Sequence, residues 1–87
     1  MIRSEDFLLR DVAGSQVLVP VGAAVDAFAG IVTLNGSGVL LWNALETEQT
    51  EATLAEKLME KYDVSQTQAM ADVEKFLSRL QEIGAVK

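Results

Sequence analysis

The sequence predicts an α+β fold in which a three-stranded antiparallel sheet is followed by three helices. Short apolar runs separated by turn residues fill the first third of the chain, and such runs are typical of strands. Apolar residues spaced three and four apart fill the remainder, which is typical of helices that bury one face. Because strands and helices are segregated along the chain, the α+β class is favoured. A length of 87 residues suits one domain, which we expect to span residues 1–87.

The first two strands are predicted to form a hairpin. Residues 7–12 and 16–21 are apolar runs, and Ala13-Gly14-Ser15 between them supplies the turn. Pro20 has no amide hydrogen, so we expect it at the end of the second strand or at an unpaired edge position.

The third strand is predicted over residues 27–34, where the chain is apolar and partly β-branched and passes directly into a helix. Asn35 is a good N-cap for that helix. The apolar residues behind it have helical spacing: Val39, Leu41, Trp42 and Leu45. Glycine-rich junctions can bind phosphate, but Gly30, Gly36 and Gly38 lack the GxGxxG spacing and no GK[ST] follows. The junction is therefore interpreted as a tight turn that starts a helix.

Two further helices are predicted downstream. Thr50 and Ser65 are candidate N-caps, and Gly84 is a natural C-terminal stop. The first of these helices has apolar residues four apart: Leu54, Leu58 and Tyr62. The second has a continuous apolar stripe: Ala69, Val73, Phe76, Leu77, Leu80 and Ile83.

The composition excludes several kinds of chemistry. With no cysteine and no histidine, the chain cannot carry out thiol chemistry, imidazole acid–base catalysis or zinc-finger ligation. The carboxylates lie mostly on polar helix faces without an accompanying base or nucleophile, so we expect no enzyme activity, no metal and no cofactor. No apolar run is long enough for a membrane span and no signal-peptide pattern begins the chain, so we expect a cytoplasmic protein.

The last two helices are joined by a tight turn, as in the helix-turn-helix of winged-helix proteins, so a nucleic-acid-binding regulator is an alternative function. Such a protein needs Lys and Arg that reach phosphates and base edges from its second helix. That helix offers only Lys75 and Arg79, interleaved with Asp72, Glu74 and Glu82, and the net charge of the chain is −6. Because this charge repels a phosphate backbone, we expect no nucleic-acid partner.

Several short motifs lie in order along most of the chain. They are Val17-Leu18-Val19-Pro20, Ile31-Val32-Thr33-Leu34-Asn35 with Gly38 and Leu41-Trp42, Tyr62-Asp63-Val64, Asp72-Val73, Phe76-Leu77, and Leu80 before Gly84. This ordered set closely resembles the PqqD family, the small protein D of pyrroloquinoline-quinone biosynthesis, whose relatives are recognition elements for ribosomally synthesised, post-translationally modified peptides. The resemblance implies a winged-helix-like module that is not an enzyme. It would be a peptide-binding adaptor that holds the leader segment of a precursor peptide while a tailoring enzyme, such as a radical-SAM enzyme, modifies the rest.

The resemblance also implies a binding site, in which the leader adds as a strand to the third strand and lies against the last helix. Mapped onto this sequence, one wall comprises Ala27, Phe28, Ala29, Gly30, Ile31, Val32 and Thr33. The other wall comprises Asp72, Lys75, Phe76 and Arg79. The small residues of the first wall would let a peptide backbone approach, or they simply pack against a neighbouring helix.

Lys75 and Arg79 lie one helical turn apart and are the preferred place to receive an acidic leader peptide. The alternative is that they pair locally with Asp72 and Glu82. We expect the protein to act as a free-standing partner of the tailoring enzyme, away from membranes, as a monomer or a weak homodimer.

Overall fold

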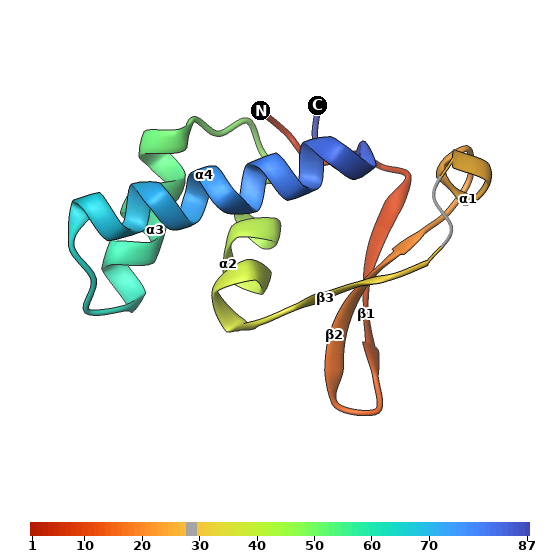
Figure 1. Ribbon diagram of the computed structural model, residues 1–87, viewed down its shortest axis with the longest axis horizontal. Coiled ribbons are helices and arrows are strands. Elements are labelled where there is room, and N and C mark those ends of the chain that lie inside the picture. Colours follow the sequence, from red (N-terminus) through yellow and green to blue (C-terminus); the bar gives the residue numbers. More distant parts are fainter. Residues whose placement is uncertain (28–29) are drawn as a thin grey trace.

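The computed structural model describes residues 1–27 and 30–87 and has the predicted α+β order (Figure 1). In chain order, its elements are β1 (Phe7–Val12), β2 (Ser15–Pro20), α1 (Ala24–Ala27), β3 (Val32–Leu34), α2 (Gly36–Ala44), α3 (Glu51–Lys61) and α4 (Gln66–Ile83). The strand order is β1-β2-β3, and both pairings are antiparallel. The three-stranded sheet and the three long helices are therefore confirmed, and the short helix α1 is an addition to the prediction.

The β1–β2 hairpin turns through a two-residue loop. Val12 pairs with Ser15, which leaves Ala13 and Gly14 in the turn. Both have a positive φ, 53° and 85° respectively, as in a type I′ turn, whose twist matches that of the flanking strands. The amide of Gly14 also donates a hydrogen bond to Oδ1 of Asp11 at 3.1 Å. Local turn chemistry thus fixes the register of the hairpin.

The third strand is shorter than the sequence predicts. The prediction of a strand over residues 27–34 was wrong for Ala27, which is the last residue of α1, for Gly30, which lies in a bend, and for Ile31, which precedes β3. Gly30 has a φ of 135°, a conformation that other residues rarely adopt, so the chain is not extended there. The predicted strand residues Phe28 and Ala29 lie outside the described part of the chain. The ladder of β3 with β2 therefore begins only after this bend.

The long helices begin where the sequence predicts, and the last one, α4, also ends there. The side-chain oxygens of Asn35, Thr50 and Ser65 each accept a hydrogen bond from the backbone amide three residues later, at 2.9, 3.1 and 3.1 Å. Gly84 ends α4 with a φ of 75°, the left-handed conformation that favours glycine at this position. Because each cap satisfies backbone groups that the helix leaves free, these boundaries are set locally.

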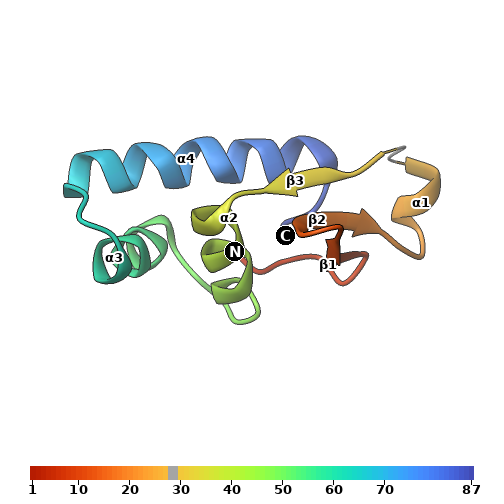
Figure 2. The ribbon, with the colours of Figure 1, turned by 90° about the horizontal axis from the view of Figure 1, so that it is seen from below.

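One apolar core joins the sheet to the three long helices. Its larger members are Phe7, Leu18, Val32, Leu34, Leu41, Trp42, Leu45, Leu54, Leu58, Val73, Leu77 and Leu80. Trp42 is 2% exposed, so its ring packs in the core and is not available to stack on a ligand. In both views α2 continues directly from the end of β3 (Figures 1 and 2).

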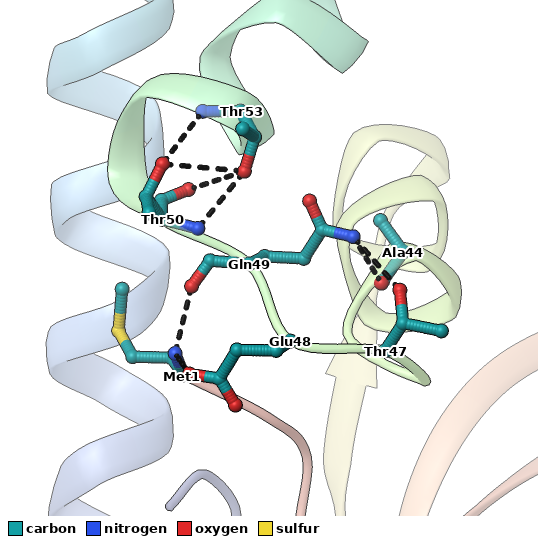
Figure 3. A network of polar contacts seen from close by, with 7 residues as sticks. All are labelled: Met1, Ala44, Thr47, Glu48, Gln49, Thr50 and Thr53. Atoms are coloured by element: carbon teal, nitrogen blue, oxygen red, sulfur yellow. Dashed lines mark hydrogen bonds and ion pairs between the residues drawn. The ribbon is translucent and has the colours of Figure 1, made fainter.

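The two chain ends lie together and are held by backbone hydrogen bonds. Ile2 and Lys87 exchange two bonds of 3.1 and 2.7 Å, and Arg3 forms an isolated antiparallel bridge with Val86. Figure 3 shows how the first residue is also tied to the α2–α3 connection. The amino group of Met1 forms an ion pair with Glu48 and donates to the carbonyl of Gln49 at 2.7 Å, while the Gln49 side chain donates to the carbonyl of Ala44 at 3.0 Å.

In the described part of the chain, no helix combines the length and the apolar character that crossing a membrane requires.

Candidate functional site

A groove of ≈ 500 Å³ lies between β3 and α4. Its lining residues are Val32, Thr33, Leu34, Asn35, Ser37, Gly38, Leu41, Asp72, Lys75, Phe76, Arg79 and Leu80. They come from one strand, from the first turns of α2 and from the middle of α4, which are far apart in sequence. We refer to this set as the groove.

The strand wall of the groove has an unpaired edge. β3 pairs with β2 on one side only, through Leu18 with Val32 and Gln16 with Leu34, and no other described strand pairs with it. Val32 and Leu34 are buried in the core, whereas the Thr33 side chain is exposed on the opposite face. Backbone N–H and C=O groups on the free edge are therefore available to another extended chain.

The helix wall of the groove combines an aromatic ring with charged groups. Asp72, Lys75, Phe76 and Arg79 follow the spacing i, i+3, i+4 and i+7, so they share one side of α4. The Phe76 ring is half-buried and packs against the core, which leaves part of it to line the groove. A Cβ on Gly38 would lie 3.4 Å from Cε1 of Phe76, so the glycine allows α2 to pass close beneath the ring.

The two cations of this wall have no carboxylate partner. In residues 1–27 and 30–87 the only ion pair joins the Met1 amino group to Glu48. Asp72 instead accepts a hydrogen bond from Nε2 of Gln68 at 2.9 Å. Local pairing of Lys75 and Arg79 with acidic neighbours is therefore not observed, and both exposed cations face the groove in a chain of net charge −6.

The groove unites six of the eleven residues that the resemblance implied: Val32, Thr33, Asp72, Lys75, Phe76 and Arg79. Ala27 belongs to α1, and Gly30 and Ile31 do not line the groove, since the chain bends before β3 begins. Phe28 and Ala29 lie outside the described residues.

The sequence interpretation missed the contribution of α2 to the groove. From the sequence, Asn35 and Gly38 are interpreted only as cap and turn residues, because caps and turns are local features. Their place in the groove depends on the packing of α2 against α4, which no local pattern encodes. The spacing of Gly38 one turn before Trp42 was the available signal, since a glycine on a buried helix face often marks close packing.

Most of the chain, residues 15–86, matches the model of a protein family described as coenzyme PQQ synthesis protein D (PqqD). This chain belongs to the PqqD family. The resemblance seen in its ordered motifs is thereby confirmed. A comparison with curated protein sequences gives no match.

Two solved structures share the fold of this PqqD-family chain. TbiB1 in complex with the TbiA(beta) leader peptide has a TM-score of 0.78 and 17% sequence identity, and the match covers 100% of this chain and 95% of that chain. Lasso peptide synthetase B1 complexed with the leader peptide has a TM-score of 0.74 and 20% identity, with 95% and 92% covered. At these identities the likeness confirms the α+β fold.

A larger hollow, of ≈ 590 Å³, lies at the other edge of the sheet of this PqqD-family chain, between β1, the segment before it and α2. Two cations, Arg3 and Arg10, line this hollow, and Arg3 is already engaged. The Arg3 guanidinium lies 5.5 Å from the centre of the Trp42 ring and donates to the carbonyl of Trp42 at 3.3 Å. The groove beside β3 differs in that the strand edge lies across from a helix wall that carries two cations without such partners, so it is the stronger candidate for a binding site.

Proposed function

We propose that this PqqD-family chain is a non-catalytic adaptor that holds the leader segment of a ribosomally made precursor peptide in the groove. The observation that carries the proposal is the free edge of β3, which faces the wall of α4 across the groove. An extended peptide can add to such an edge as a further strand, so that main-chain hydrogen bonds hold it and side-chain contacts select it.

The short length of β3 limits what main-chain pairing can contribute. A strand of three residues offers few hydrogen bonds to a partner, and each contributes a net stabilisation of only about 0.5–1.5 kcal/mol. Contacts with the Phe76 ring and attraction to Lys75 and Arg79 would have to supply much of the affinity. An extended peptide that carries apolar and acidic residues is therefore the expected ligand.

The comparisons support this proposal, because TbiB1 and lasso peptide synthetase B1, which share this fold, were solved in complex with leader peptides. We extend the proposal to the partners that follow from it. The bound leader would be presented to a tailoring enzyme, for which a radical-SAM enzyme is one example. A monomer or weak homodimer would act in the cytoplasm, where ribosomal precursors are made. The implied wall residues Ala27, Phe28, Ala29, Gly30 and Ile31 could contact the leader where it leaves the groove.

A peptide selection tests the proposal without knowledge of the natural precursor. A phage-displayed library of random peptides about 12 residues long would be selected on the intact protein, and enriched peptides would be titrated while amide NMR spectra are recorded. We expect the largest shifts in β3 and around residues 72–79. Shifts confined to β1 would place the peptide at the other edge of the sheet, and failure to enrich any peptide would contradict the proposed function.

The nucleic-acid alternative is tested with duplex DNA at low salt, where non-specific electrostatic binding is strongest. We expect no shift of the groove amides. Two exposed acidic residues, Glu74 and Glu82, flank the two cations along α4 and oppose the approach of a phosphate backbone. Saturable DNA binding that competes with the selected peptide would favour the regulator instead.

A further inference from the structure

A third hollow, of ≈ 340 Å³, opens where the start of α2, the end of α3 and the N-terminal half of α4 meet. Three residues line both this hollow and the groove: Asn35, Ser37 and Asp72. Four residues belong to the new hollow alone, and we call them the recess: Gly36, Leu58, Tyr62 and Val64. Because of the shared residues, the recess continues the groove beyond the end of β3.

The recess is largely apolar and has one polar group at its mouth. Leu58 is 2% exposed, while Tyr62 and Val64 are half-buried. The Tyr62 hydroxyl lies 3.2 Å from the position that a Cβ on Gly36 would occupy, so it sits over the start of α2. No described residue is a hydrogen-bond partner of this hydroxyl, which leaves it able to donate to an incoming carbonyl.

The direction of β3 determines which end of a bound peptide reaches the recess. β3 runs from Val32 toward Asn35, and both pairings within the sheet are antiparallel. Antiparallel pairs are also the more common kind. A peptide that adds to β3 in this manner runs in the direction opposite to that of the strand. Its N-terminal end therefore arrives at Asn35, next to the recess.

From this arrangement we infer that the recess holds one apolar side chain of the bound peptide, at a position N-terminal to its strand-paired segment. The inference rests on the proposed function, because it assigns a further subsite to the same ligand. A branched aliphatic or phenylalanine side chain suits the apolar walls and the volume. A charged side chain would lose its hydration there, and an acidic one would also meet the Asp72 carboxylate at the junction.

The recess also accounts for selectivity that the strand pairing lacks. Main-chain hydrogen bonds to β3 are the same for any sequence, whereas a pocket selects by size and polarity. An anchor beyond the strand would fix the register of the peptide on a ladder of only three residues. The peptide would then be held at a defined position along the groove.

Filling the recess tests the inference. The variant Val64→Trp places an indole in the hollow, and Val12→Trp adds the same bulk to an exposed hairpin residue that lines neither hollow. With a peptide selected on the wild-type protein, we expect Val64→Trp to weaken binding by at least about tenfold and Val12→Trp to leave it unchanged. Thermal unfolding followed by circular dichroism would verify that both variants are folded.

A change on the peptide side keeps the test independent of protein folding. Replacing the apolar residue N-terminal to the strand-paired segment by alanine should weaken binding to the wild-type protein by a similar factor. The same replacement should have little further effect on Val64→Trp, because the two changes remove one contact. A nitroxide label at the N-terminus of the peptide should broaden the amide signals of Tyr62 and Val64, and a C-terminal label those of Ile31.

The outcomes separate this inference from the proposed function. If the peptide shifts the groove amides but both the filled recess and the alanine peptide bind normally, the recess is not a subsite and the adaptor function stands. If the C-terminal label broadens the recess amides, the peptide is parallel to β3 and the assignment of an N-terminal anchor is wrong. If no peptide shifts the groove amides, the proposed function fails and the recess inference fails with it.

Discussion

Two cations on α4, Lys75 and Arg79, face the groove without an ion-pair partner among the described residues. Exposed cations and anions usually contribute little to stability when they pair at a surface. Leaving Lys75 and Arg79 without ion pairs therefore lowers the stability of the fold very little. Their charges remain free to interact with a ligand. In a chain of net charge −6, these two residues make the groove locally attractive to carboxylates.

Reversing both charges should weaken binding of an acidic selected peptide while the fold is retained. For Lys75→Glu/Arg79→Glu we expect a loss of about five- to thirtyfold, or about 1–2 kcal/mol for the two charges together. Isothermal titration calorimetry would measure the affinity. The matched control, Arg10→Glu/Lys57→Glu, makes the same change in net charge at exposed residues outside the groove and recess and should bind nearly as the wild type. Equal losses in both variants would mean that only overall charge matters.

The cap of α4 offers a second test at the level of one residue. Ser65 Oγ accepts a hydrogen bond from the Gln68 amide at 3.1 Å. Ser65→Ala should lower the free energy of unfolding by about 1 kcal/mol, which corresponds to about 4–8 °C in the melting temperature of a domain of this size. Ser78→Ala, in the exposed middle of the same helix, should be neutral or slightly stabilising because alanine has the higher helix propensity. Denaturant titration of the two variants would distinguish a cap from a passive surface serine.

One residue in the turn of the β1–β2 hairpin does not suit its backbone conformation. Ala13 occupies the first turn position with a φ of 53°, a conformation that costs an alanine about 1 kcal/mol and that asparagine tolerates better. Ala13→Asn should therefore stabilise the fold by roughly 0.5–1 kcal/mol. Ala13→Val, with a β-branched side chain at positive φ, should destabilise it. Peptide affinity should be unchanged in both variants, because the turn lines neither the groove nor the recess. Chemical denaturation would measure the stabilities, and titration calorimetry would measure the affinities.

The elements of this fold differ in how far the sequence could specify them. The helix starts at Asn35, Thr50 and Ser65 were predictable, because each cap is a contact within three residues. The start of β3 was not, because Gly30 could be interpreted equally as a small strand residue or as a residue in a bend. The short helix α1 has only four residues, too few to show a helical period.

The residues of the candidate site also differ in how far the sequence could specify their positions. The spacing of Asp72, Lys75, Phe76 and Arg79 along one helix placed them on one side, and the family resemblance placed that side toward the third strand. The recess could not be anticipated, because its residues come from the start of α2, the end of α3 and the α3–α4 connection and meet only through tertiary packing. Tyr62 illustrates this point: its four-residue spacing predicted a core position, yet its hydroxyl reaches the mouth of the recess.

The whole molecule should fold without any metal or cofactor. It has no cysteine or histidine, and no cluster of acidic residues suited to a metal ion was found in residues 1–27 and 30–87. A core shared by the sheet and the three long helices supplies the stabilisation. Dialysis against a strong chelator should leave the thermal midpoint unchanged in a calorimetric scan. A downward shift of several degrees would reveal a bound ion that contributes to stability.

The paired chain ends have a consequence for how this module can be combined with others. Residues 2 and 87 are hydrogen-bonded neighbours, and neither end lines the groove or the recess. A host protein could therefore carry the whole unit as an insertion in one surface loop, since the inserted chain would enter and leave at adjacent points. By the same geometry, a circular permutant with joined ends should fold when it is opened at the hairpin loop. A modifying enzyme could thus acquire peptide recognition by a single insertion, and the groove would remain open to solvent.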